Sequence, residues 1–243
     1  VLGTIQPVGE IGRGLREQSP DALFLVDAAQ TLGHVPVDVV SDEIDLLAIA
    51  GHKGLLGPTG TGGLYVGPRA YGNDASTSRL FCDRRGGTGA VAPGLEMPET
   101  LPDALEAGTG NAVGLAGLEA AMDVELPGRH ESEAERTRSI IQSLNEIPGV
   151  RTFGLGADAR RMPVVLFNIE GAHPREVAAE LDERWGIGVR GGTHCAPMLH
   201  DKLGLGDAGG VRASPGYRTT PEEIDRFLEA VRTLAAAVVG ASG

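Results

Sequence analysis

Residues 48–63 read AIAGHKGLLGPTGTGG and place Lys53 directly after an apolar run and before a series of glycines. The apolar run over residues 45–50 predicts a buried strand, and the glycines predict a turn at its end. The chain contains only two lysines among its 21 basic residues, which leaves 19 arginines. Unlike arginine, a lysine in dry surroundings can lose its proton near neutral pH. The stretch therefore predicts a reactive amine at a strand end.

Short apolar runs and helical patterns alternate on both sides of this stretch. Residues 8–18 have apolar side chains at helical spacing, and ALFLVDAAQ, residues 22–30, predicts a strand that ends in Asp27. GGLYVG, residues 62–67, predicts a third strand. This alternation indicates an α/β sheet in which the polar residues gather where strands end, so we expect the site there.

The second half of the chain predicts a smaller α/β domain. Residues 71–110 have no sustained period, and we interpret them as a long functional loop. Further strands are expected in MPVVLFNIE, IGVRGG and GGVRASPG, with a helix in HPREVAAELDERWG. The last helix is expected to start with Thr220 as cap, Pro221 in its first turn and Glu223 completing a capping box. We place the domain boundary between residues 125 and 126.

Composition argues against several classes of partner. A net charge of −12 and an aromatic content of 4% leave no basic groove with stacking platforms, so nucleic acid is not an expected ligand. No apolar run reaches the length of about eighteen residues that a membrane helix needs. The first residues lack the pattern of a secretory signal, and two distant cysteines fit a reducing compartment, so a cytoplasmic location is expected. Because Val1 is not a methionine, we expect an incomplete N-terminus.

Lys53, Asp27 and Gln30 form the first candidate site. A desolvated lysine can form a Schiff base with an aldehyde cofactor, and pyridoxal phosphate also needs a carboxylate near its ring nitrogen and donors for its phosphate. Asp27 can supply the carboxylate. The other candidate donors are the glycine amides, His52, Thr59 and Thr61. The alternatives are a solvated loop lysine, an aspartate that caps the next turn and a surface amide. The glycines do not match a P-loop or a dinucleotide fingerprint.

The second candidate site lies in VRGGTHCAPMLH, where Cys195 follows a predicted strand and a glycine pair. A thiol near Arg190, His194 and a possible helix start is favoured as the reactive thiolate. The alternatives are a small buried hydrophobe, or half of a metal site made with His194 and His200. No second ligand cluster accompanies these histidines, so no metal is expected.

Arg212, in GGVRASPGY, ends another predicted strand of the second domain. Its guanidinium could hold a substrate carboxylate by two parallel hydrogen bonds. Alternatively, it could pair with a surface acid, and the spacing leaves both interpretations open.

Five motifs together resemble a known family. They are LVDAAQ, AGHKGLLGPTGTGGLYV, LPDALEAGTGN, VRGGTHCAP and VRASPGYRTTPEEID, in this order. Over nearly the whole chain they resemble class V, fold type I pyridoxal-phosphate enzymes, and specifically the cysteine desulfurases. The resemblance implies an aminotransferase-like α/β fold. In it, residues 1–125 are the C-terminal part of a large cofactor-binding domain with a mixed, mostly parallel sheet. Residues 126–243 are then a small C-terminal domain with a mobile cysteine segment.

The resemblance also implies a role for each candidate residue. Lys53 bonds the aldehyde of pyridoxal 5'-phosphate, and Cys195 accepts sulfur. The implied cofactor contacts are Asp27 to the pyridine nitrogen, Gln30 to the phenolic oxygen, His52 to the phosphate and Thr109 to the phosphate across a homodimer. Arg212 would bind the substrate carboxylate, with Arg190 as a second substrate-binding arginine.

The implied reaction removes sulfur from L-cysteine, leaving L-alanine and a persulfide on Cys195 for transfer to an acceptor protein or thiol. The alternatives are selenocysteine cleavage, amino transfer, or a catalytically silent chain that needs a complementing one. Two departures from the family are visible. Ala50 stands where the family usually has a serine or threonine that binds phosphate. The family's leading segment, with a phosphate-binding turn and a histidine that stacks on the cofactor, has no counterpart here, so a further segment or companion chain is expected.

Overall fold

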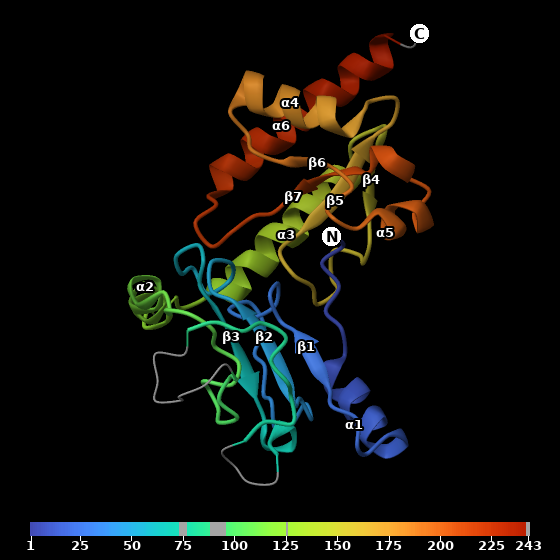
Figure 1. The fold of residues 1–243 in the computed structure, drawn as a ribbon. Helices are drawn as coiled ribbons and strands as arrows, with labels where there is room; N and C mark the ends of the chain where they lie inside the picture. Colours follow the sequence, from blue (N-terminus) through green and yellow to red (C-terminus); the bar gives the residue numbers. More distant parts are fainter. Residues whose placement is uncertain (73–76, 88–95, 125, 242–243) are drawn as a thin grey trace. The chain divides into compact units, whose positions relative to one another are not determined.

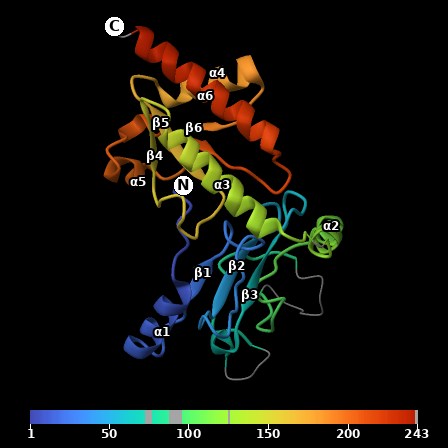
Figure 2. The same ribbon diagram turned by 180° about the vertical axis from the view of Figure 1, so that it is seen from behind.

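The computed structural model describes residues 1–72, 77–87, 96–124 and 126–241 (Figure 1, Figure 2). The chain divides into two compact units, Gln6–Glu125 and a second unit of Val1–Ile5 with Leu126–Gly243. The first five residues join the second unit, contrary to the sequence-based boundary. The reason is that Arg161 donates to the carbonyl of Leu2 over 2.8 Å and holds this segment. No helix in the described ranges is long and apolar enough to cross a membrane.

The first unit contains a three-stranded mixed sheet in the order β1-β2-β3. β1 pairs with β2 in parallel, and β2 pairs with β3 in the antiparallel direction. The mixed sheet is confirmed, with one pairing of each kind among the described strands. The elements of this unit are α1 (Val8–Gln18), β1 (Leu25–Asp27), β2 (Leu46–Ala50), β3 (Gly62–Val66), the 3-10 turn η1 (Pro68–Ala70) and α2 (Ala112–Met122).

The second unit contains a four-stranded antiparallel sheet in the order β4-β5-β7-β6. Its first strand was not predicted, because VRTF is short and alternates with polar residues. Its elements are α3 (Arg129–Asn145), β4 (Val150–Phe153), β5 (Val165–Ile169), α4 (Pro174–Trp185), β6 (Arg190–Gly192), α5 (Pro197–Lys202), η2 (Gly206–Ala208), β7 (Gly210–Ala213) and α6 (Pro221–Ala241).

Helices α3, α4 and α6 bury one face of this sheet, and Figure 2 shows α3 and α6 in front of the strands. Alternate residues of a strand point to one face, and the core residues follow that rule. Val211 and Ala213 of β7 lie in the helix-covered core, where Phe167 meets Phe227 edge to face at 5.8 Å. Arg212, between Val211 and Ala213, therefore lies on the opposite face.

The predicted capping box of the last helix is confirmed. The amide of Thr220 donates to Oε2 of Glu223 over 2.9 Å, and the amide of Glu223 donates to Oγ1 of Thr220 over 3.2 Å. These reciprocal bonds satisfy two amides that a helix start leaves without partners. They fix where α6 begins, and with it the end of the loop after β7.

The loop that carries Lys53 is closed and tightly packed. The amide of Gly57 donates to the carbonyl of Gly51 over 2.8 Å, and the amide of Leu56 donates to the carbonyl of Lys53 over 2.9 Å. A Cβ atom on Gly54 would lie 2.2 Å from the carbonyl oxygen of Leu32. The turn after β1 and the loop after β2 thus touch backbone to backbone, which only glycine permits.

We expect Gly54→Ala to destabilise the first unit by roughly 1–3 kcal/mol, because the added methyl group has to displace the backbone at Leu32. The matched control is Gly63→Ala in β3, where a Cβ atom meets nothing within 4 Å. The free energy of unfolding from urea titration checks both variants. Equal stability of the two variants would show that the loop has room to move.

Candidate active site

Lys53 and Asp27 lie beyond neighbouring strand ends of the first unit. Asp27 is the last residue of β1 and pairs in register with Ala48 of β2, and Lys53 follows the end of β2 by three residues. Because β1 and β2 are parallel, their carboxyl ends meet at one edge of the sheet, the usual place for a ligand in an α/β sheet. Lys53 is half-buried, and Asp27 is exposed.

Asp27 also has a structural contact. Its Oδ1 accepts a hydrogen bond from the amide of Ala29 over 2.9 Å, so it caps the turn that follows β1. Gln30 and His52 are exposed in the turns after β1 and β2 respectively. These turns therefore bring an amine, a carboxylate, an amide and an imidazole to the same edge of the sheet.

Residues before α2 contact the far end of the Lys53 loop. Asn111 caps α2 by accepting from the amide of Gly114 over 3.0 Å, and its Nδ2 donates to the carbonyl of Gly60 over 3.5 Å. Thr109 is exposed two residues before this cap. The segment with Thr109 is thus anchored next to the glycine turn that follows Lys53.

Thr59, Thr61 and Ala50 differ in whether their side chains can donate a hydrogen bond to a phosphate. Thr61 is buried, and its hydroxyl donates to the carbonyl of Pro58 over 2.6 Å, so this group stabilises the turn. Thr59 is exposed. Ala50 ends β2 opposite Gly62 and has no side-chain donor. Of these three residues, only Thr59 presents a hydroxyl to solvent.

Two arginines of the second unit lie side by side on the sheet face opposite the helices. Arg190 of β6 and Arg212 of β7 are directly paired across the antiparallel ladder, so their side chains share a face. Nε of Arg212 is buried and has no hydrogen-bond partner among the described residues. Burial, followed by the charge of Arg190, lowers the pKa of Arg212. Two adjacent cations with an unsatisfied donor make this face a good binding site for a carboxylate.

Cys195 is exposed in the turn after β6, beside one of these arginines. Nη2 of Arg190 lies 3.8 Å from its Sγ. The turn leads into α5, which has only six residues. Arg190 thus places a positive charge at the thiol, and Arg212 on the same face also interacts electrostatically with Cys195.

His194 differs from expectation, because its ring does not serve the thiol. Its Nε2 lies 2.8 Å from the carbonyl oxygen of Arg190, and its Nδ1 lies 3.3 Å from Nε2 of His200. Burial lowers the pKa of His194, which favours the neutral ring. His194 therefore contributes no positive charge beside Cys195. The described residues hold no group of three or more side chains that could bind a metal ion.

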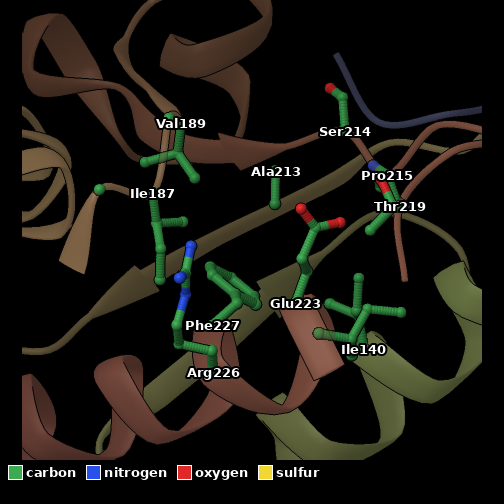
Figure 3. Close-up of a pocket in the computed structure, with 13 residues that line it drawn as sticks. Ile140, Ile187, Val189, Ala213, Ser214, Pro215, Thr219, Glu223, Arg226 and Phe227 are labelled. Carbon is green, nitrogen blue, oxygen red and sulfur yellow. The ribbon is translucent and has the colours of Figure 1, made fainter. Parts of the chain in front are cut away.

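A separate cavity of about 210 Å³ lies in the second unit, against the start of α6. Figure 3 shows Ile187, Glu223 and Phe227 around it. Its lining includes Val189 and Ala213, which come directly before and after the paired arginines in sequence. None of the candidate site residues lines this cavity, so it is distinct from the arginine face.

Two features of the second unit were not predicted from the sequence. One is the pairing of Arg190 with Arg212, which the antiparallel register places opposite each other. The other is the burial of His200, which the sequence pattern indicates only as a metal ligand. Both features depend on contacts between segments that the local pattern does not specify.

The amino-acid sequence is similar to that of known pyridoxal-phosphate enzymes. The family model for class V aminotransferases matches residues 1–227. A probable cysteine desulfurase from Methanothermobacter thermautotrophicus is 38% identical, over 96% of this chain and 58% of its own length. A cysteine desulfurase from Haloferax volcanii is 31% identical, over 95% of this chain and 52% of its own length.

Solved structures show the same likeness. The apo cysteine desulfurase from Thermococcus onnurineus NA1 has a TM-score of 0.78 at 34% identity and is matched over 98% of this chain and 58% of that one. The cysteine desulfurase CsdA from Escherichia coli has a TM-score of 0.79 at 28% identity, over 98% of this chain and 57% of that one. The fold is thus the aminotransferase-like fold type I, and the chain spans about half the length of the curated relatives it matches. On the family model that covers most of its residues, the chain belongs to the class V aminotransferase family.

Proposed function

We propose that this chain belongs to a cysteine desulfurase, which removes sulfur from L-cysteine and leaves L-alanine and a persulfide on Cys195. The observation that favours this activity over other class V reactions is the exposed Cys195 thiol, 3.8 Å from Nη2 of Arg190. Relatives named as cysteine desulfurases or probable cysteine desulfurases, at 31–38% identity, support it.

Pyridoxal phosphate is the cofactor of the class V family, and the edge of the first unit's sheet fits it. The cofactor needs an amine, a carboxylate and polar donors on converging turns, and the ends of β1 and β2 supply these from one edge. When bound, it supplies an electron sink for the substrate's Cα. The residues proposed to hold it are Lys53, Asp27, Gln30, His52 and Thr109. We propose that Thr109 serves the site of a second subunit in a homodimer.

The substrate carboxylate is proposed to bind at the paired arginines. The buried Nε of Arg212 lacks a partner among the described residues, and a carboxylate can accept from it and from a terminal nitrogen together. Arg190 adds a second positive charge on the same face. Binding an anion here also relieves the repulsion between the two guanidinium groups.

The remaining steps follow from the two reactive side chains. The Lys53 amine, in its unprotonated form, accepts the Cα proton of the substrate. The Cys195 thiolate attacks the substrate sulfur, so that a sulfur–sulfur bond forms as the Cβ–sulfur bond breaks. Cβ gains the electron pair and a proton and is thereby reduced, while the two sulfur atoms are oxidised to the level of a disulfide. L-cysteine and the enzyme thiol are thereby converted to L-alanine and the enzyme persulfide. An acceptor thiol then receives the outer sulfur of this persulfide, and the Cys195 thiol is regenerated.

We further propose that the two units have separate tasks. The unit of Gln6–Glu125 would be the cofactor-binding part, because it contains Lys53 and Asp27. The unit of Leu126–Gly243 would provide the substrate anchor and the persulfide, because it contains Arg212 and Cys195.

Replacing the thiol tests the activity. In the Cys195→Ala variant we expect L-alanine formation from L-cysteine to fall by at least about 100-fold, because no group accepts the sulfur. Cys82→Ala, which removes the only other thiol, is the control and should keep the parent rate. Alanine is quantified by amino-acid analysis with pyridoxal phosphate and a reducing thiol present. Unchanged alanine formation in the Cys195 variant would show that Cys195 is not the sulfur acceptor.

Replacing the substrate anchor tests its binding role. Arg212→Gln should raise the KM for L-cysteine by roughly 10- to 100-fold with a smaller change in kcat, because a charge-assisted hydrogen bond contributes about 1.5–3 kcal/mol. Arg232→Gln, at an exposed position of α6, removes an arginine whose contact is Glu229 at 3.7 Å, and it serves as the matched control. An unchanged KM in the Arg212 variant would place the carboxylate elsewhere.

A further inference from the structure

His200 is a buried polar residue of the second unit that the proposed reaction does not use. Its side chain is fully buried, with 0% of its surface exposed. Its Nε2 lies 3.3 Å from Nδ1 of His194, and the two rings are 5.4 Å apart at an angle of 38°. A buried imidazole needs a reason, because an unsatisfied polar group in the interior is costly.

The contacts of the two rings determine which nitrogens carry protons. Nε2 of His194 lies 2.8 Å from the carbonyl oxygen of Arg190, and a carbonyl only accepts, so this nitrogen is the donor. Burial lowers the pKa of both His194 and His200, which favours neutral rings. In neutral His194, Nδ1 is then an acceptor. Nε2 of His200 must therefore be the donor to it.

One nitrogen remains without a partner in this arrangement. Nδ1 of His200 is buried and has no hydrogen-bond partner among the described residues. A backbone contact with Thr193 counters the effect of burial on the pKa of His200, so the ring has a second polar neighbour besides His194. An apolar side chain of similar size would avoid the cost of the buried Nδ1, so these polar contacts are what distinguish the histidine.

The backbone next to this pair is strained. His194 and Cys195 have φ values of 53° and 59°, in the left-handed region that residues other than glycine rarely adopt. Two such residues in succession persist only when the surroundings hold them. Both ring nitrogens of His194 have a contact, and His194 directly precedes Cys195 in the chain.

We propose that His200 is a positioning residue that holds the His194 ring inside the second unit and thereby keeps the Cys195 thiol exposed beside Arg190. It acts through His194 and touches neither substrate nor cofactor. The inference rests on the proposed function only for the task of the thiol. The geometry itself can be tested without turnover or bound cofactor.

The test compares two alkylating reagents on the thiol. Iodoacetate is an anion and iodoacetamide is neutral, so the ratio of their rate constants reports the positive charge near Sγ. The parent for all variants is Cys82→Ala, which leaves Cys195 as the only thiol. The variants are His200→Phe, which fills the space without a donor, and His200→Gln, which keeps a donor. Arg190→Gln gives the ratio expected when the charge is lost.

We expect His200→Phe to lower the iodoacetate-to-iodoacetamide ratio by roughly fivefold at low ionic strength, toward the ratio of the Arg190 variant. That is the effect of one unit charge about 4 Å away in water. His200→Gln should restore the ratio to within about twofold of the parent. His130→Phe, which removes an exposed imidazole of the same unit, is the matched control and should leave the ratio unchanged.

A folded His200→Phe variant with the parent ratio would overturn the proposal. Nitrogen-detected spectra of the unmodified chain give a second test that needs no substitution. At pH 7.5 both His194 and His200 should carry their proton on Nε2. A proton on Nδ1 of His200 in the neutral ring would overturn the proposed donor even if the variant does not fold.

Discussion

The amide of Gly57 donates to the carbonyl of Gly51, and this bond closes the loop that carries Lys53. The loop has little freedom, because Gly54 lies against the backbone of Leu32 with no space for a Cβ atom. A lysine on such a loop keeps its position at the carboxyl edge of the parallel strands. Since one cofactor has to reach Lys53 with its aldehyde and Asp27 with its ring nitrogen, the proposed use of both residues depends on this packing.

In the second unit, strand alternation produces both the core and the proposed anion site. Val211 and Ala213 face the helices, so Arg212 between them must face the other way. The antiparallel register then places Arg190 beside Arg212. Cys195 follows in a turn whose left-handed backbone depends on packing rather than on glycine. The unit therefore combines a four-stranded sheet with a strained turn at the thiol, and the proposed persulfide would form in that turn.

Much of the fold was readable from the sequence, because strong local patterns decide it. The strands around Asp27 and Lys53 are short apolar runs that end in glycine or polar residues, and the capping box at Thr220 is a local motif. What the sequence did not reveal depends on long-range contacts. The pairing of Arg190 with Arg212, and the attachment of residues 1–5 to the second unit, arise from segments far apart in the chain. The contact of His194 with His200 is local, but it depends on the burial of both rings, which the sequence pattern around Cys195 does not specify.

The central claim is that Lys53 is the amine that bonds the aldehyde of pyridoxal phosphate. Borohydride reduction of the protein with the cofactor bound fixes the cofactor to whichever amine holds it, and peptide mass spectrometry then identifies that residue. The chain offers only one other lysine, Lys202, which is exposed in α5. The account predicts the reduced cofactor on the peptide that contains Lys53. Label on Lys202, with Lys53 unmodified, would contradict it.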